Sequence, residues 1–367
     1  MRILVITNLY PDRKRPAFGI FVSAHVEALR QAGADVDVAA IRRTGVHGDI
    51  GRKYALLFGS AVARGALALF RRARPQIVEA HIAYPTGVIA WPIARLMGAK
   101  LVLYVHGADV HEVGSRSRLH HRLARFVFAR ADLVVVNSRY SERSLLGGYA
   151  VDPRKVVVLS PGIDVRQFAA ETNVSRDQRQ ILFVGTLNEQ KGVDVLLRAM
   201  ARVGTQASLR IVGDGPARDS LEAEAAALQL MVRFDGAVQP DGVARAMAAC
   251  AILVVPSVYG EALGLVALEA MASGALVIAS RTGGLVETVE DGVNGFLAPP
   301  GDAEALALCI ERALAIVDAG GDTLDHLVTA GRKRATEHDI VGVTLKILAR
   351  YSMLTGTTSM ATTMNAK

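Results

Sequence analysis

Two glutamates, Glu261 and Glu269, are separated by seven residues where an apolar strand ends and a helix begins. The helix is predicted to start near Gly264 and to carry Glu269. Its free backbone N–H groups and positive dipole end suit a diphosphate. Glu269 lies about 7–8 Å along the helix at 1.5 Å per residue, so the two carboxylates cannot contact the same ligand atoms. They are placed to bind hydroxyl groups on either side of a diphosphate.

Lys191 lies near the start of a second predicted helix, after a strand at 181–184 and a loop that begins at Gly185. A lysine at this position adds a full positive charge close to another helix N-terminus. Such a charge can stabilise negative charge that develops on a ligand bound there. We therefore expect Lys191 to act together with Glu261.

In the first half of the chain, His106 ends a strand and is followed by Gly107 and Asp109. Ligands of open α/β sheets bind beyond the carboxyl ends of the strands, so His106 is predicted to lie where a ligand binds. An earlier loop carries Gly19 and three consecutive cations, Arg13, Lys14 and Arg15. Gly19 allows close backbone approach to a ligand, and the cations could hold an anionic acceptor.

Apolar, β-branched runs alternate with helical patterns along the whole chain, which is typical of βαβ units and parallel sheets. Hydrophobic residues make up 51% and charged residues 21% of the 367 residues, so we expect an ordered globular protein. We predict an N-terminal domain at 1–168 and a C-terminal domain at 169–337, each a Rossmann-like, doubly wound parallel sheet. A helix at 338–354 should pack back on the N-terminal domain, and 355–367 should form a disordered tail.

The segment from Val254 to Gly274 resembles the E-x7-E motif of the retaining glycosyltransferases of family 4, which have the GT-B fold, and the similarity covers nearly the whole chain. The resemblance implies two domains facing a cleft. Glu261 would contact the transferred sugar and Glu269 the ribose hydroxyls. His106 would be catalytic and hydrogen bond near the reacting centre, and Asp109 would lie on the acceptor side. The implied donor-phosphate contacts are Gly19, Gly185, Thr186, Leu263, Gly264, Leu265 and Val266.

One position departs from the family pattern, because many relatives carry Arg where this chain has Thr186. Loss of a bidentate cation weakens stabilisation of the leaving group. Gly283, Gly284 and Gly295 lie in further family signatures, and we interpret these glycines as tight turns that need no function.

The function expected from the resemblance is transfer of a sugar, with retention, from a nucleotide-diphosphate sugar to a glycan or lipid-linked acceptor in bacterial surface polysaccharide synthesis. No cofactor beyond the co-substrate and no metal is expected, because helix amides and Lys191 can neutralise the diphosphate. A non-catalytic nucleotide-sugar-binding protein and a sugar-nucleotide epimerase remain alternatives. A nicotinamide enzyme is disfavoured because Arg218 stands where the dinucleotide fingerprint after Gly213 and Gly215 needs Gly or Ala.

Charge is distributed unevenly: residues 1–168 hold 25 Lys and Arg against 12 Asp and Glu, whereas 169–367 hold 17 against 23. The predicted helix at 116–130 is basic and amphipathic, which favours reversible contact with anionic membrane. The residues expected to make that contact are Arg116, Arg118, Arg122 and Arg125. No recognition motif for nucleic acid accompanies the charge. Without a signal peptide pattern or a bilayer-length apolar run, we expect a cytoplasmic protein, peripheral at the inner face of the membrane.

Overall fold

The protein divides into two units, residues Met1–Gly162 with Ile340–Lys367, and residues Ile163–Asp339. The computed structural model describes residues 1–12, 18–41, 50–70, 74–107, 110, 117–169, 174–203 and 207–357. The first unit ends at Gly162 and not at residue 168, because α8 (Val165–Ala169) packs on helices of the second unit. Residues 358–367 of the expected tail lie outside the described residues.

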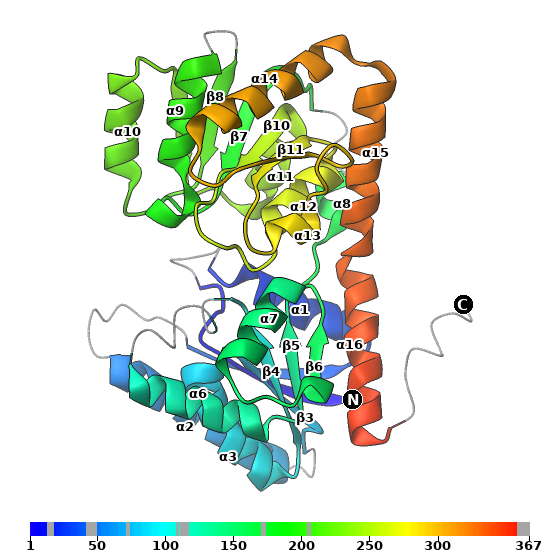
Figure 1. Ribbon diagram of the computed structural model, residues 1–367. Coiled ribbons are helices and arrows are strands. Elements are labelled where there is room, and N and C mark those ends of the chain that lie inside the picture. Colours follow the sequence, from blue (N-terminus) through cyan, green and yellow to red (C-terminus); the bar gives the residue numbers. More distant parts are fainter. Residues whose placement is uncertain are drawn as a thin grey trace. The chain divides into compact units, whose positions relative to one another are not determined.

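A six-stranded parallel sheet in the order β2-β1-β3-β4-β5-β6 forms the first unit. The strands are β1 (Arg2–Thr7), β2 (Asp35–Ala40), β3 (Ile77–His81), β4 (Lys100–Val105), β5 (Leu133–Val136) and β6 (Val156–Val158). The helices are α1 (Ile20–Gln31), α2 (Ile50–Phe70), α3 (Val88–Met97), α6 (Arg118–Arg130), α7 (Arg139–Gly148) and α16 (Ile340–Thr355). Figure 1 shows helices on both faces of this sheet.

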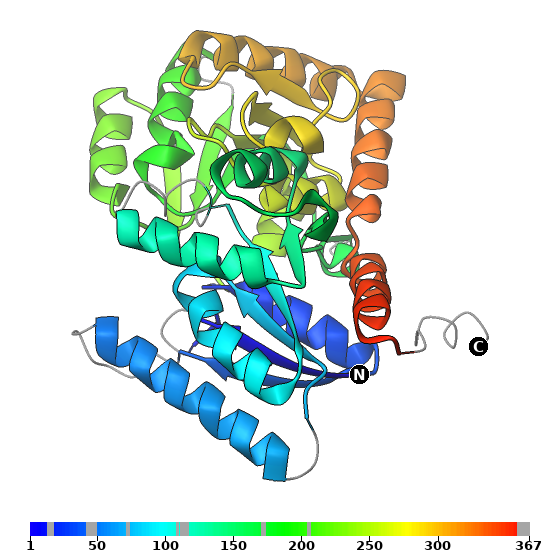
Figure 2. The ribbon, with the colours of Figure 1, turned by 60° about the horizontal axis from the view of Figure 1, so that its bottom comes forward.

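Side chains alternate between the two faces of the sheet, as the pleat of a strand requires. Ile3 and Val5 of β1 pack with residues of α1 and α16, whereas Leu4 and Ile6 pack with α2, α3 and α6. Both faces are therefore buried, which explains why the strands are near-continuous apolar runs. Figure 2 shows α2 and α3 on one side of the sheet, with α1 and α16 on the other.

The second unit has a parallel sheet in the order β12-β11-β10-β7-β8-β9. Its strands are β7 (Asp177–Val184), β8 (Ser208–Val212), β9 (Val232–Gly236), β10 (Cys250–Val255), β11 (Leu276–Ser280) and β12 (Phe296–Ala298). This is the doubly wound strand order, whose direction of winding reverses between β7 and β10. The last strand, β12, has three residues and follows a glycine-containing turn.

The second sheet is covered on one face by α9, α10 and α14 and on the other by α8, α11, α12 and α15. The remaining helix bounds are α9 (Val193–Val203), α10 (Arg218–Ala227), α11 (Pro240–Ala249), α12 (Leu265–Ser273), α13 (Leu285–Thr288), α14 (Ala303–Ala319) and α15 (Gly321–Glu337). Of the helices that the structure describes, none combines the length and apolar character needed to span a bilayer.

Candidate functional site

Lys191 and Glu261 meet at the carboxyl ends of β7 and β10, where the second sheet reverses its winding. Lys191 Nζ lies 2.5 Å from Glu261 Oε1, and both side chains are partly buried. The same carboxylate oxygen accepts a hydrogen bond of 2.7 Å from Ser257 Oγ, which sequence reasoning did not identify. Two donors on one oxygen hold Glu261 in a fixed orientation and leave its second oxygen for a ligand.

Backbone contacts tie together the two loops that carry this pair. The N–H of Val258, after β10, donates to the carbonyl of Gln190, in the 3₁₀ turn that contains Lys191. A side chain at Gly192 would lie 2.1 Å from the carbonyl oxygen of Pro256, so only glycine permits this approach. The side chain of Asn188 accepts from the N–H of Lys191 and caps the turn. The pair is therefore positioned by main-chain contacts and not only by its own charges.

Helix α12 begins beside this pair with its N-terminal N–H groups open. Gly264 has φ 85°, and a side chain there would meet Leu285. Within the described part of the chain, the N–H groups of Leu265 and Val266 have no acceptor. The side chain of Leu263 packs in the core, and its carbonyl accepts from Thr288 Oγ1. Open N–H groups at the positive end of a helix dipole are suited to bind an anion.

Glu269 lies on α12, with its side chain only partly exposed. Burial raises the pKa of its carboxyl to about 7. Among the described residues no hydrogen-bond donor or cation pairs with that carboxyl, and burial is the one cause of its raised pKa. An acceptor that is desolvated and unpaired is suited to receive ligand hydroxyls, because a hydrogen bond to its charged form restores what burial has removed.

Gly283 and Gly284, predicted as turn residues, hold the segment that carries Glu261. Gly283 has φ 57°, and a side chain there would lie 2.5 Å from the backbone nitrogen of Glu261. The N–H of Gly284 donates to the carbonyl of Glu261 at 2.6 Å. In the sequence, the doubled glycine after a strand was the only sign that this segment holds the Glu261 backbone. A doubled glycine does not distinguish a tight turn from a close contact between two backbone segments.

The loop after β7 contains Gly185 and Thr186. A side chain at Gly213 would overlap the carbonyl oxygen of Gly185, so the loops after β7 and β8 pack backbone to backbone. Thr186 is exposed. In the first unit, Gly19 (φ 68°) caps α1, and a side chain there would meet the backbone of Leu9. The close approach that requires glycine at position 19 is thus to the chain's own loop.

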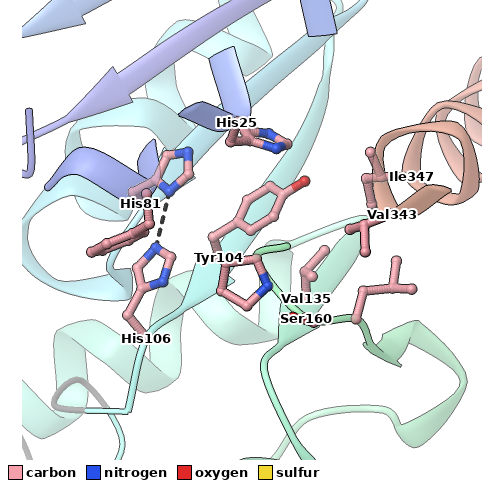
Figure 3. A pocket seen from close by; sticks show the side chains of 11 residues that line it. His25, His81, Tyr104, His106, Val135, Ser160, Val343 and Ile347 are labelled. Carbon is pink, nitrogen blue, oxygen red and sulfur yellow. Dashed lines mark hydrogen bonds between the residues drawn. The ribbon is translucent and has the colours of Figure 1, made fainter. Parts of the chain in front are cut away.

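His106 follows β4 in the first unit and lines a small cavity with Phe21, His25, His81 and Tyr104 (Figure 3). His106 Nε2 lies 2.9 Å from His81 Nδ1. Burial, with a smaller contribution from His81 and His25, holds the pKa of His106 well below its usual value. Burial likewise lowers the pKa of His81. Both imidazoles are therefore neutral near pH 7.

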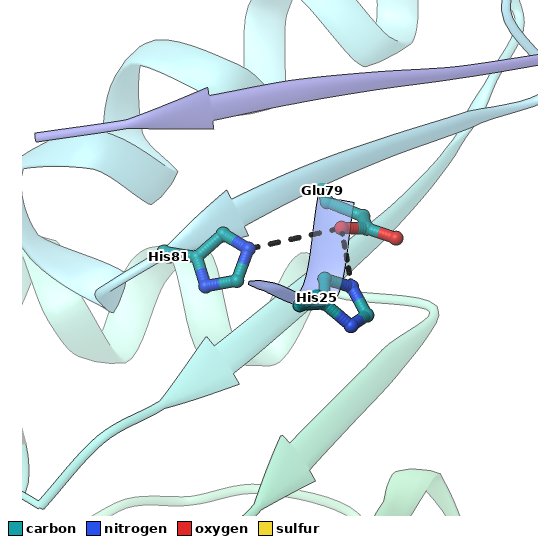
Figure 4. Close-up of side chains that lie close together, drawn as sticks. All are labelled: His25, Glu79 and His81. Atoms are coloured by element: carbon teal, nitrogen blue, oxygen red, sulfur yellow. Dashed lines mark hydrogen bonds and ion pairs between the residues drawn. The ribbon is translucent and has the colours of Figure 1, made fainter. Parts of the chain in front are cut away.

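Glu79 precedes His81 by two residues on β3 and is fully buried, and Figure 4 shows it beside His25 and His81. Burial opposes its charge, but the charges and hydrogen bonds of His25 and His81 hold its pKa at about 2. His25, Glu79 and His81 each offer one atom that could ligate a metal, and these atoms lie within 4.8 Å of one another. The 3.1 Å separation of His25 Nε2 and Glu79 Oε2 is also that of an ordinary hydrogen bond. The expectation that no metal is needed stays a prediction.

Several residues identified from the sequence lie outside the described residues: Arg13, Lys14, Arg15, Asp109 and Arg116. On α6, Arg118, Arg122 and Arg125 are exposed along one side of the helix. Val127 and Phe128 of this helix pack in the core, whereas Leu119 is 61% exposed. The apolar side of this helix is therefore only partly buried.

Residues 19–167 match the family model described as Glycosyltransferase Family 4, and residues 164–334 match the model described as glycosyl transferases group 1. The D-inositol 3-phosphate glycosyltransferase of Geodermatophilus obscurus is 33% identical over 285 residues, 67% of this chain and 63% of that protein. The corresponding protein of Corynebacterium kroppenstedtii is matched over 45% of its length. The alpha-maltose-1-phosphate synthase of Mycolicibacterium smegmatis is 27% identical, with 96% and 100% covered.

Among solved structures, sucrose-phosphate synthase from Thermosynechococcus elongatus superposes with a TM-score of 0.79 at 25% identity, covering 97% of this chain and 99% of that one. HepE from Anabaena in complex with UDP-glucose has a TM-score of 0.75 at 22% identity, covering 96% and 100%. The second likeness shows the fold alone. Two doubly wound sheets with a cationic, amide-rich site at a switch point define an α/β protein of the GT-B type. The chain belongs to the group 1 glycosyltransferases of family 4.

Proposed function

We propose that this protein transfers a sugar from a nucleotide-diphosphate sugar to a hydroxyl acceptor with retention of configuration. The observation that carries the proposal is the Lys191–Glu261 pair, 2.5 Å apart beside the open N-terminus of α12. A cation and free amides can neutralise a departing diphosphate, while a fixed carboxylate can orient sugar hydroxyls. These are the two requirements of glycosyl transfer from an activated donor.

Each site residue has a role in this scheme. The N–H groups of Leu265 and Val266, with Lys191, bind the diphosphate. Glu261 binds the transferred sugar, and Glu269 accepts hydrogen bonds from the ribose hydroxyls. The acceptor oxygen forms a bond to the anomeric carbon as the bond to the diphosphate oxygen breaks, and the acceptor proton passes to that departing oxygen. No protein nucleophile is required when attack and departure occur on one face of the sugar.

The donor and acceptor are proposed by class. HepE has been solved with UDP-glucose, and the curated relatives are named for transfer to inositol 3-phosphate or for synthesis of maltose 1-phosphate. The open amides of α12 and the Lys191 cation suit the diphosphate of a nucleoside diphosphate donor. We propose a glycan or lipid-linked acceptor in the synthesis of surface polysaccharide. Thr186 leaves this chain without the cation of many relatives, so Lys191 and the helix amides carry more of the phosphate charge.

The experiment is a transfer and donor-hydrolysis assay with UDP-, GDP- and ADP-sugars. Lys191→Ala and Glu261→Ala should each lower turnover by on the order of a hundredfold. Unchanged turnover in both variants would refute the site. Nucleotide-sugar binding with no turnover of any donor would favour the non-catalytic alternative, and conversion of a donor to its epimer without acceptor would favour the epimerase.

A second proposal concerns α6. This helix exposes Arg118, Arg122 and Arg125, and it also exposes the apolar side chain of Leu119. Basic side chains around an exposed apolar one suit the surface of an anionic membrane. The chain should sediment with anionic but not neutral vesicles. Replacing these three arginines by Gln should abolish sedimentation, whereas the same change at the exposed Arg166, Arg202 and Arg245 of the second unit should not. Equal binding to both vesicle types would overturn the proposal.

A further inference from the structure

Glu79 of β3 is a fully buried carboxylate with two hydrogen-bond partners and a third polar neighbour, His81. His25 Nε2 lies 3.1 Å from Glu79 Oε2, and the hydroxyl of Tyr351 donates to Glu79 Oε1 at 2.7 Å. His81 Nε2 lies 3.7 Å from Glu79 Oε2, which is longer than a hydrogen bond but within the distance of an ion pair, and this nitrogen has no hydrogen-bond partner among the described residues. Figure 4 shows both imidazoles beside the carboxylate. Tyr104 lies within 2.9 Å of the Tyr351 hydroxyl and donates to it, because the single proton of Tyr351 is already used on Glu79. The carboxylate is thus held ionised.

The pleat of the strands explains how this cluster forms. Ile77, Glu79 and His81 alternate along β3 and point to the face covered by α1 and α16. Tyr104 pairs with His81 on the neighbouring strand and lies on the same face. Parallel strands buried on both faces are normally apolar throughout, and burying a charge is costly. Glu79 and His81 are exceptions to that rule, and His81 contacts His106 directly.

The charge on Glu79 sets the tautomer of His81, and with it the direction of the hydrogen bond between His81 and His106. An ionised carboxylate only accepts, so it favours the form of His81 whose proton is on Nε2 and disfavours the form with a lone pair there. His81 is neutral, so its Nδ1 then carries the lone pair. That nitrogen lies 2.9 Å from His106 Nε2, which must therefore be the donor of their hydrogen bond. Figure 3 shows the two rings joined through these nitrogens.

We propose that Glu79 and His81 are positioning residues, which fix His106 as the tautomer with its proton on Nε2 and its lone pair on Nδ1. The role that follows for His106 rests on the proposed function. His106 works as a hydrogen-bond acceptor for a substrate hydroxyl, and not as a cation. A carboxylate that sets the tautomer of an imidazole through its far nitrogen is a known device of enzyme sites. Here the imidazole of His81 stands between the carboxylate of Glu79 and the imidazole of His106 and transmits the effect from one to the other.

The cluster at His25, Glu79 and His81 could instead hold a metal ion. The two arrangements place the imidazole protons on different ring nitrogens. A metal bound at His81 Nε2 would take the lone pair of that nitrogen and leave the proton on Nδ1. His81 would then donate to His106, and His106 would carry its own proton on Nδ1. The tautomer of His106 therefore distinguishes the proposal from a metal site.

The test is a long-range ¹H–¹⁵N spectrum of the full chain labelled with ¹⁵N-histidine, with His81→Asn and His106→Gln used to assign the two rings. The expected result is a proton on Nε2 of both His81 and His106 near pH 7. A proton on Nδ1 of His106 would overturn the proposal. This measurement needs no turnover, so it fails or succeeds separately from the glycosyltransferase function.

Kinetics of Glu79→Gln provide the second readout. Removing the charge should leave His106 as a mixture of tautomers and lower kcat at least about tenfold, with little change in the KM of the donor. His121→Gln, which removes an imidazole stacked on Tyr149 away from this cluster, should retain the wild-type kcat and the wild-type spectrum of His106. Wild-type kcat in Glu79→Gln together with an unchanged His106 tautomer would contradict the proposal.

Discussion

Lys191 Nζ and Glu261 Oε1 lie 2.5 Å apart although the residues are 70 positions apart in the chain. If Lys191 neutralises the donor diphosphate, it must share its charge between Glu261 and the phosphates. Lys191→Met should therefore raise the Kd of UDP, GDP or ADP by about tenfold to a hundredfold. Glu261→Gln should leave that Kd unchanged or lower it, because it frees Lys191, and should still reduce transfer.

Isothermal titration with each nucleoside diphosphate measures both effects. Lys155→Met is the matched control, since Lys155 of the first unit donates to the carbonyl of Ala131 and should not affect binding. Weaker nucleotide binding in Glu261→Gln, to the same extent as in Lys191→Met, would show that the pair is a structural ion pair.

Gly283→Ala should disturb the site through the backbone of Glu261. The added carbon would lie 2.5 Å from that backbone nitrogen, so the segment must move, and a displacement of this size costs catalysis heavily. Gly292 also has positive φ but open space around it, so Gly292→Ala carries only the backbone strain of about 1 kcal/mol. We expect turnover to fall on the order of a hundredfold in the first variant and to remain near wild type in the second. Equal activities would refute the positioning role of Gly283.

The regular parts of this fold could be predicted from the sequence, and the reason is physical. Strands buried on both faces produce apolar runs such as Ile181–Val184, which stand out from the helices between them. The short strand β12 lacks the length for such a signal. The helix start at Gly264 was predictable because its cause is local, a glycine before a helical pattern.

Long-range contacts could not be predicted in this way. Tyr351 reaches Glu79 across 272 positions, and nothing local to either residue indicates the other. The signal available was negative: Glu79 and His81 interrupt an otherwise apolar strand at alternate positions. Ser257 likewise follows β10 without a motif of its own, and only the structure brings it to Glu261.

Tyr351→Phe should destabilise the first unit by about 1.5–3 kcal/mol, because it removes a hydrogen bond to a buried carboxylate. Tyr104→Phe removes only a neutral hydrogen bond to the Tyr351 oxygen and should cost about 1 kcal/mol. Urea unfolding followed by circular dichroism measures both. A smaller loss in Tyr351→Phe than in Tyr104→Phe would contradict the assigned direction of these hydrogen bonds.

Glu79 should make stability depend on acid pH. Its pKa is about 2 in the folded protein and 4.5 ordinarily, so the unfolded chain binds more protons between those values. The stabilisation, about 3 kcal/mol, is present above pH 4.5 and is lost as pH falls toward 2. His25 and His81 face this carboxylate, and the Tyr351 hydroxyl does not titrate in that range. Unfolding curves of Glu79→Gln should lack this loss, and parallel curves for the two proteins would refute it.

Glu269→Gln should separate binding from stability. Burial raises the pKa of Glu269 to about 7 from 4.5, so the folded protein binds more protons in that window and loses stability as pH rises through it. The variant lacks this loss and should unfold at a higher temperature than wild type at pH 8, with no difference at pH 4.5. The same change weakens a hydrogen bond to a charged acceptor, so the Kd of the nucleoside diphosphate at pH 8 should rise about tenfold or more. Because a solvated helix residue would alter neither quantity, a variant that matches wild type in both Tm and Kd at pH 8 would remove Glu269 from the site.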